Sequence, residues 1–240
     1  MAWEAADIAA PALRWRGAEP MVALEAARAP GCGCAALRCR PPPRRDGWCR
    51  TFYTPELSVN DAAALVTAVP AGVEATAAVD VALDARHTFD QAGVYVDVDA
   101  GCFVKAGLEV VDGAPRLSVV VTNHGWSDWS TQPWPHGPRA RVRVHKLHRP
   151  QGACVLVEAD TAGAASWARC PAADGADAAA AAQWSFVRIA PLHAPAGAPW
   201  HMGAYAASPV AAGLEATLQH LSVARRTAAL SHDASLDAHA

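Results

Sequence analysis

Apolar and polar residues alternate with a period of two in three successive runs between residues 91 and 122. One face of these runs would carry the aliphatic residues Ala92, Val94, Val96, Val98, Val104, Ala106, Leu108, Val110, Leu117, Val119 and Val121. The opposite face would carry Gln91, Tyr95, Lys105, Glu109, Ser118 and Thr122, together with the apolar Phe103 and Val120. Such alternation is typical of antiparallel strands that pack one face on a core. The stretch therefore predicts three adjacent strands joined by two turns.

The two turns set the expected register of these strands. Residues 99–101, Asp-Ala-Gly, are typical of a three-residue hairpin loop in which glycine takes a positive φ. That loop would pair Val98 with Cys102, Tyr95 with Lys105 and Gln91 with Glu109. A second turn over residues 112–115 and their flanks would pair Leu108 with Val119 and Ala106 with Val121, and would set Glu109 by Ser118 and Lys105 by Thr122. A slip of one residue would turn the valines to water, so the pattern specifies the faces.

The rest of the chain predicts more short strands and no long amphipathic helix. Strands are expected within residues 20–25, 48–53, 62–69, 73–83, 141–145, 154–158, 185–189, 201–206 and 215–223. Residues 126–138, rich in tryptophan and proline, are expected to form a loop. We predict an all-β protein, with a leader at 1–12, one β-sandwich domain at 13–225 and a mobile tail at 226–240. The Cys/Pro/Arg-rich residues 29–46 and the Ala-rich residues 171–183 are interpreted as surface insertions.

Charge and cysteine content exclude several classes of partner. The formal net charge of −3 indicates neither a nucleic-acid nor a membrane partner. No apolar run reaches the ~20 residues of a spanning helix, and residues 1–17 lack the pattern of a secretory signal. A cytoplasmic location with reduced thiols is expected for the seven cysteines. Cys32, Cys34, Cys39 and Cys49 lack paired zinc-knuckle spacing, so we predict no metal site and no cofactor.

Several motifs carry a resemblance to a known family. Residues 90–99 (DQAGVYVDVD), 103–113 (FVKAGLEVVDG) and 117–130 (LSVVVTNHGWSDWS) resemble the core of the family named for a regulator of enolase. Residues 46–51 (DGWCRT) are similar to its Asp-Phe-Trp-Arg-Lys-Thr segment, and Phe52-Tyr53 to the Tyr-Gly that follows. Residues 203–209 are similar to its Gly-x-x-x-x-Ser-Pro turn, and Arg188 matches an arginine that precedes this strand.

The resemblance extends over residues 13–225 and implies a concanavalin A-like jelly-roll fold of two antiparallel sheets. It implies little chemistry, because the family has no firmly assigned reaction. The chain departs from the family pattern at Gly47, at Cys49 and in the two insertions. Thr54-Pro55 replaces the glycine expected after Tyr53, which puts the geometry of that loop in question.

The polar strip of the central strands is the first candidate site. Gln91, Tyr95, Lys105, Glu109, Ser118 and Thr122 would line it, and Trp126 and Trp129 would wall one side. Aromatic faces stack on sugar rings, and the amide and charged groups would hydrogen-bond hydroxyls. Alternatively, the strip is a solvated outer face, although Phe103, Tyr95 and Val120 suggest partial cover. The tryptophans could equally pack as a lid over the sandwich edge.

Catalysis has less support in the sequence. Lys105 and Glu109 lie about 13 Å apart along one strand, too far for a tight dyad, and Glu109 has no acidic neighbour in the expected register. We therefore favour a non-catalytic, lectin-like domain that binds a carbohydrate or related small ligand on the concave sheet face, with a regulatory role in carbohydrate metabolism. Two alternatives stay open: a glycoside-acting enzyme using Glu109, with Lys105 tuning it, and a regulatory scaffold with a protein partner.

Overall fold

The protein is a sandwich of two antiparallel sheets of seven strands each. The computed structural model describes residues 13–17, 21–25, 36–163, 182–226 and 230. In sheet order, sheet 1 contains β1 (Arg14–Arg16), β6 (Ala63–Val69), β15 (Trp200–Ala207), β8 (Gln91–Asp99), β9 (Cys102–Val111), β10 (Ala114–Asn123) and β11 (Trp126–Pro133). Sheet 2 contains β14 (Trp184–Pro191), β13 (Gly152–Asp160), β12 (Arg139–Arg149), β7 (Ala75–Asp84), β16 (Glu215–Arg225), β3 (Ala36–Arg40) and β2 (Met21–Glu25).

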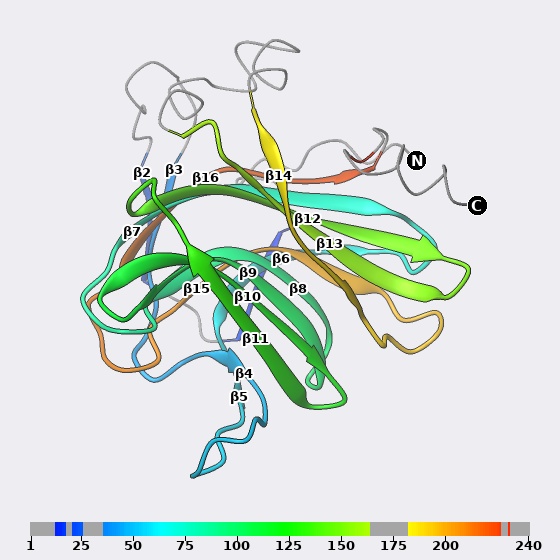
Figure 1. The fold of residues 1–240 in the computed structure, drawn as a ribbon, viewed down its shortest axis with the longest axis horizontal. Coiled ribbons are helices and arrows are strands. Elements are labelled where there is room, and N and C mark those ends of the chain that lie inside the picture. The colour runs from blue at the N-terminus through cyan, green and yellow to red at the C-terminus, as the bar shows by residue number, and fades with distance from the viewer. Residues whose placement is uncertain (1–12, 18–20, 26–35, 164–181, 227–229, 231–240) are drawn as a thin grey trace.

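The main core lies between the two sheets, which curve over each other in Figure 1. Aliphatic side chains from both inner faces fill it, and most of them are completely buried. Sheet 1 contributes Val94, Val96, Val104 and Leu108, and sheet 2 contributes Val79, Val81, Val142 and Val144. The alternation of small and branched aliphatic residues thus builds the sandwich as the pattern predicts.

The first central hairpin has the expected pairing over most of its length. Tyr95 pairs with Lys105 and Gln91 with Glu109, as predicted. At the turn, however, Cys102 pairs with Asp99, because the register shifts between Asp97 and Asp99. Such a bulge adds one residue to one strand, so the turn itself is shorter than the three-residue loop expected.

The second central hairpin is paired two residues away from the predicted register. Asp112 and Gly113 both have positive φ, so the turn between β9 and β10 contains only these two residues. As a result, the observed pairs are Leu108 with Leu117, Ala106 with Val119, Lys105 with Val120 and Gly107 with Ser118. The Asp-Gly pair is the usual signal for this tight turn. A slip of two residues leaves every side chain on its predicted face.

Three regions of the chain differ from the sequence-based expectations. Residues 126–133 form strand β11 instead of a loop, and in the 48–53 region only Trp48 is in a strand. Residues 36–40, assigned to a surface insertion, form β3 in sheet 2 with Leu37 and Cys39 buried. The alternation Leu-Arg-Cys-Arg was hidden among the prolines and arginines that follow.

The boundaries of the domain are only partly described. The leader at 1–12, residues 29–35 of the first insertion and most of 171–183 lie outside the described residues. Leu230, in the segment expected to be a mobile tail, is buried against Leu147 and Leu156. Within the described ranges, no helix is long and apolar enough to cross a membrane.

Candidate functional site

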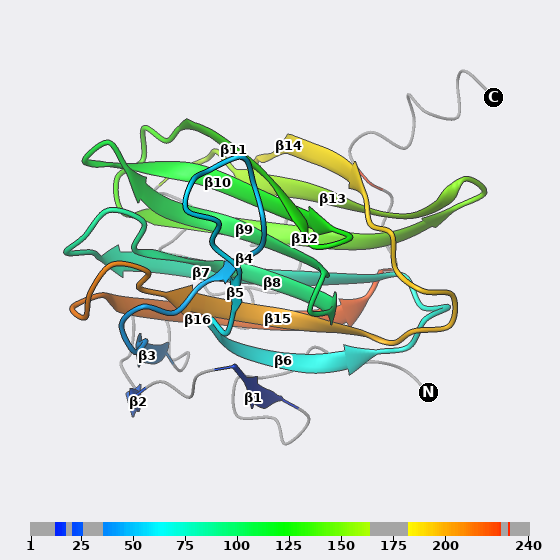
Figure 2. The ribbon, with the colours of Figure 1, turned by 90° about the horizontal axis from the view of Figure 1, so that it is seen from below.

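A loop covers the outer face of sheet 1, and we call residues 47–60 the cover loop. It contains the short strands β4 (Gly47–Trp48) and β5 (Val59–Asn60), which pair with each other. The backbone carbonyl of Asp46 accepts hydrogen bonds from the amides of Asp61 (2.8 Å) and Ala62 (2.9 Å), which brings the two ends of the loop together. Figure 1 shows β4 and β5 below sheet 1, and Figure 2 shows them crossing in front of it.

A charged cluster lies between the base of the cover loop and the sheet. Lys105 Nζ on β9 donates to Asp46 Oδ1 at 2.5 Å and to Gln91 Oε1 at 2.9 Å. The Tyr205 hydroxyl donates to the same Gln91 oxygen at 3.0 Å, and the Gln91 amide donates to the backbone oxygen of Phe89 at 3.1 Å. Lys105 and Asp46 are both buried. A buried ammonium requires such an anionic partner, so Asp46 fixes the loop over the sheet.

A second polar cluster surrounds Glu109, further along the same face. The Ser118 hydroxyl donates to Glu109 Oε2 at 2.5 Å, and Trp129 Nε1 on β11 donates to the same oxygen at 3.1 Å. Burial raises the pKa of Glu109, although Lys105 and these hydrogen bonds act in the opposite direction. Glu109 therefore holds its proton to a higher pH than an exposed glutamate does.

Apolar side chains complete the contact between the cover loop and the sheet. Tyr95, Phe103 and Tyr205 form a small core with Cys49 of the loop. The Tyr95 hydroxyl donates to Asn60 Oδ1 at 2.6 Å, which attaches the end of the loop. Burial raises the pKa of Tyr205 well above its usual range, so this hydroxyl remains a donor. The outer face of sheet 1 is thus a second core.

The structure corrects the expectation of an open polar strip. The side chains of Gln91, Tyr95, Lys105, Glu109, Ser118 and Thr122 do lie on one sheet face, as predicted, but all six residues are buried. The cover loop and the residue before it take the place expected for a ligand, because they supply Asn60 and Asp46 as hydrogen-bonding partners. Even Thr122, nearest the end of β10, is hydrogen-bonded to Ser127 at 2.7 Å. Gln91, Tyr95 and Lys105 therefore hold the loop and its base in place, whereas Glu109, Ser118 and Thr122 are hydrogen-bonded to each other or to β11.

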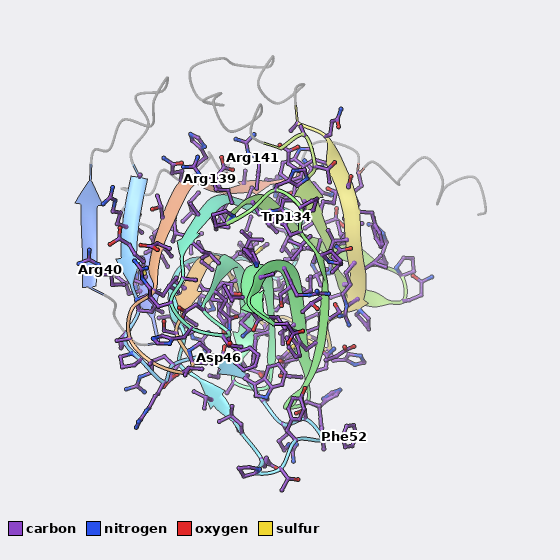
Figure 3. The ribbon with its side chains drawn as sticks, turned by 60° about the vertical axis from the view of Figure 1, so that its left-hand side comes forward. Arg40, Asp46, Phe52, Trp134, Arg139 and Arg141 are labelled. Carbon is purple, nitrogen blue, oxygen red and sulfur yellow. The ribbon has the colours of Figure 1, made fainter. Side chains whose placement is uncertain are left out.

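Several exposed or half-buried aromatic residues gather on and around the cover loop instead. We call the group of Trp48, Phe52, Tyr53, Phe89, Trp126 and Trp129 the aromatic surface. Phe52 is 95% exposed, Tyr53 65% and Trp126 45%. Trp48 stacks on Tyr53 at 6.5 Å between ring centroids, and Phe52 lies 5.7 Å from Trp126. In Figure 3, Asp46 lies near the sheet, and Phe52 lies farther out, at the periphery of the molecule.

Trp129 connects the aromatic surface with the buried cluster below it. Its ring meets Trp48 edge-on at 6.0 Å and Phe89 at 6.2 Å, while its Nε1 reaches Glu109. Trp126 instead contacts Phe52 and the guanidinium of Arg50. Of the predicted site residues, only these two tryptophans are therefore accessible. The sequence reasoning missed Asp46, Phe52 and Tyr53, although the family-like motif at 46–53 contained all three.

Other parts of the chain offer less. An open cavity of about 440 Å³ lies away from the cover loop and is lined by Leu83, Asp84, Ala85, Arg86, His87, Thr88, Val110, Gly113, Pro115 and Pro138. None of the sequence-predicted site residues lines it. Among the described residues no group of three or more His, Cys, Asp or Glu side chains is arranged to hold a metal. Cys39 and Cys49 are buried, whereas Cys32 and Cys34 lie outside the described residues.

The fold defines a concanavalin A-like jelly-roll sandwich of two antiparallel sheets. A profile of the family described as "Protein of unknown function (DUF1349)" matches residues 34–226, and the chain belongs to this family. The chain is also 39% identical over 106 residues to "Regulation of enolase protein 1" of Saccharomyces cerevisiae. That match covers 43% of this chain and 51% of the relative, so the chain spans about half the length of this curated protein.

Solved structures agree with this assignment of the fold. A functionally unknown protein from Saccharomyces cerevisiae aligns with a TM-score of 0.70 at 24% identity, over 93% of this chain and 100% of that one. Bacteroides ovatus xyloglucan PUL GH43B aligns with a TM-score of 0.53 at 13% identity, over 80% of this chain and 33% of that one. Xylan beta-1,4-xylosidase from Bacillus halodurans aligns with a TM-score of 0.51 at 9% identity, over 90% of this chain and 39% of that one. At these identities the likeness shows the fold alone.

Proposed function

We propose that the protein is a non-catalytic, cytoplasmic saccharide-binding domain whose binding site is the aromatic surface formed by the cover loop and the neighbouring residues Phe89, Trp126 and Trp129. The observation that carries the proposal is the exposure of Phe52 and Tyr53, on a loop that is held by buried polar contacts, together with Trp126 of β11. A large exposed aromatic group is unusual in a globular domain unless a ligand or partner covers it. Flat rings held at fixed positions bind the apolar faces of sugars with little loss of conformational entropy.

In this proposal the polar strip supports the site and does not touch the ligand. Gln91 and Lys105 position Asp46, and Glu109 positions the indole of Trp129. The similarity to a relative named for regulation of enolase supports a regulatory role in carbohydrate metabolism. The glycoside hydrolase family 43 structures add only the fold.

Glycan binding by aromatic-surface variants tests the proposal. A glycan array would identify candidate ligands, and titration calorimetry would then compare the parent with Phe52→Ala and Trp126→Ala. Each variant should lose about tenfold or more in affinity, because a stacked ring at the centre of a site usually contributes over 1 kcal/mol. Val210→Ala is the matched control, since Val210 is 49% exposed and lies outside the aromatic surface. Absence of any saccharide binding, or unchanged binding by both ring variants, would contradict the proposal.

One observation favours a second candidate, a glycoside-acting enzyme. Glu109 has a raised pKa, as a general acid requires, and it lies beneath Trp129 at the edge of the aromatic surface. Its burial opposes this function, because a substrate could reach it only if the surrounding rings moved. Hydrolysis of chromogenic glycosides by the parent and its loss in Glu109→Gln would support the enzyme. A bound protein that competes with saccharide would instead favour the regulatory scaffold.

A further inference from the structure

A single arginine lies within the aromatic surface. The Arg50 guanidinium stacks on the ring of Trp126 at 4.8 Å from the centroid. Its only hydrogen bonds in the described part of the chain are long ones to backbone oxygens, from Nε to Gly125 at 3.4 Å and from Nη2 to His124 at 3.5 Å. The Nη1 nitrogen is left for another acceptor. A guanidinium that stacks on an indole keeps its edge of N–H groups turned outward for a planar, anionic partner.

Arg50 differs in this respect from other arginines near it. Arg45 is paired with Asp61, and Arg188 of β14 is paired with Asp128 of β11 at 2.6 Å. No carboxylate among the described residues forms an ion pair with Arg50. The Asp99 carboxylate accepts a hydrogen bond from the Gly101 amide. Within the described part of the chain, the aromatic surface therefore carries one cation that has no carboxylate partner, next to exposed rings.

The backbone around Arg50 is held in place at several points. Its carbonyl oxygen accepts a hydrogen bond from the Ser127 amide at 2.9 Å, and the Cys49 amide donates to the Ser127 hydroxyl at 2.9 Å. On the other side, the amide of Gly125 donates to the carbonyl of Gly101 at 2.9 Å. Cation and rings are thus fixed relative to one another, as a preorganised site requires.

Two exposed histidines, His124 and His193, add hydrogen-bond donors at this end of the sandwich. The ring centroids of His124 and His193 lie 5.0 Å apart, and the Asn123 side chain accepts a hydrogen bond from the His193 amide at 2.8 Å. Both imidazoles can donate a hydrogen bond in either tautomer. The described residues around Arg50 thus present donors and rings, and this combination selects a ligand with an acidic group attached to a stacking face.

We propose that Arg50 forms a cationic subsite of the aromatic surface and binds the carboxylate of a uronic acid residue. This inference rests on the proposed saccharide-binding function and names the class of saccharide. The sugar ring would stack on Trp126 and Phe52, and its carboxylate would take two N–H groups of Arg50 in a fork-shaped contact. The ligand class is therefore acidic oligosaccharides such as uronate polymers or uronate-branched xylans.

Paired ligands that differ only in charge test the subsite. Titration calorimetry would compare trigalacturonate with its methyl ester, and xylo-oligosaccharides with and without a glucuronate branch. We expect the acidic member of at least one pair to bind about tenfold more tightly, with an advantage that shrinks as salt is added. The variants are Arg50→Gln, Arg50→Lys and, as a control in the same stretch of chain, Arg44→Gln, which removes an exposed charge outside the aromatic surface.

The outcomes separate this inference from the proposed function. Arg50→Gln should remove the preference, so that the acidic and neutral members of a pair bind equally to this variant, whereas Arg50→Lys should retain only part of the preference, because lysine lacks the planar fork. Arg44→Gln should bind like the parent. Equal binding of neutral and acidic ligands by the parent, or a preference that survives Arg50→Gln, would contradict the cationic subsite at Arg50 but not the proposed saccharide-binding function. No binding of either member would overturn both. Thermal unfolding of each variant confirms that it is folded.

Discussion

The Asp46 carboxylate is a buried contact at the base of the cover loop. It is the anionic partner of a lysine that is buried in the outer face of sheet 1, and the Asp46 backbone closes the loop. Charges of this kind are costly to bury singly, and the pair is tolerated because each satisfies the other. Asp46 therefore stabilises the loop through both its side chain and its backbone.

Asp46→Asn should lower the free energy of unfolding by about 3 kcal/mol, because it leaves the Lys105 ammonium buried without its anion. Urea unfolding followed by fluorescence measures this loss. Asp61→Asn is the matched control: it breaks the more exposed pair with Arg45 and should cost no more than about 1 kcal/mol. Equal losses in the two variants would mean that the buried pair has no special role.

Glu109→Gln should change how stability depends on pH. Burial raises the pKa of Glu109 in the folded protein, so ionisation of this carboxyl is less favourable in the folded state than in the unfolded state. At low pH, where Glu109 is protonated in both states, folding does not carry this cost. The free energy of unfolding of the parent therefore falls as the pH rises above the ordinary carboxyl pKa and through the higher pKa of Glu109 in the folded state. Glutamine does not ionise, so the stability of the variant relative to the parent should rise from about pH 4 to pH 8. A difference that stays constant across urea titrations in this range would argue against a buried, destabilised carboxylate.

At the scale of the strands, a glycine pair allows β8 and β9 to lie against each other. Gly93 pairs with Gly107, and a Cβ added to Gly93 would lie 2.1 Å from the Ala106 carbonyl oxygen. Gly93→Ala should therefore cost more than about 2 kcal/mol, through displacement of the backbone. Gly72→Ala is the control, since a Cβ added there would meet no atom within 4 Å. Thermal unfolding with no difference between the two would show that the strands adjust freely.

Strand faces could be predicted from the sequence more reliably than strand pairings. Face depends only on the parity of each residue, so the aliphatic residues of β8, β9 and β10 were correctly assigned to the core, with the exception of Val110, which is half-buried and lines the open cavity. Pairing depends on turn length, and reading the turn at Asp112-Gly113 as a longer loop displaced it by two residues. β11 escaped prediction because serine, aspartate, threonine and glutamine occupy most of its positions, so it lacks a hydrophobic period.

At the scale of the whole molecule, the position of the candidate site could not be predicted from alternation. The pattern shows that one face of sheet 1 is polar, but the same pattern arises whether water or another segment lies against that face. The cover loop has no periodicity of its own, and its relation to the sheet depends on the long-range contact between Asp46 and Lys105. The one local signal was the presence of Tyr95, Phe103 and Val120 on the polar face, which indicated cover.

Replacing residues 48–59 with two glycines should leave a folded but less stable sandwich. The ends of the cover loop are already adjacent, so a short connection can join them with little change to the sheets. The replacement would expose Tyr95, Phe103 and Tyr205, so binding of a hydrophobic dye should increase while the far-ultraviolet circular dichroism keeps its β-sheet form. Global unfolding of this variant would mean that the loop is required for the sandwich itself.

The two hydrogen bonds at Asp46 O have a consequence for diversification. Because the ends of the cover loop are hydrogen-bonded to each other on a rigid sheet, substitutions within the loop should leave the fold of the sandwich unchanged. Antibody domains vary their recognition loops in the same way. Residues 51–58 are therefore suitable positions for sequence libraries from which variants that bind new targets are selected. Asp46, Lys105 and Gln91 would be kept unchanged, because they attach the loop to the sheet.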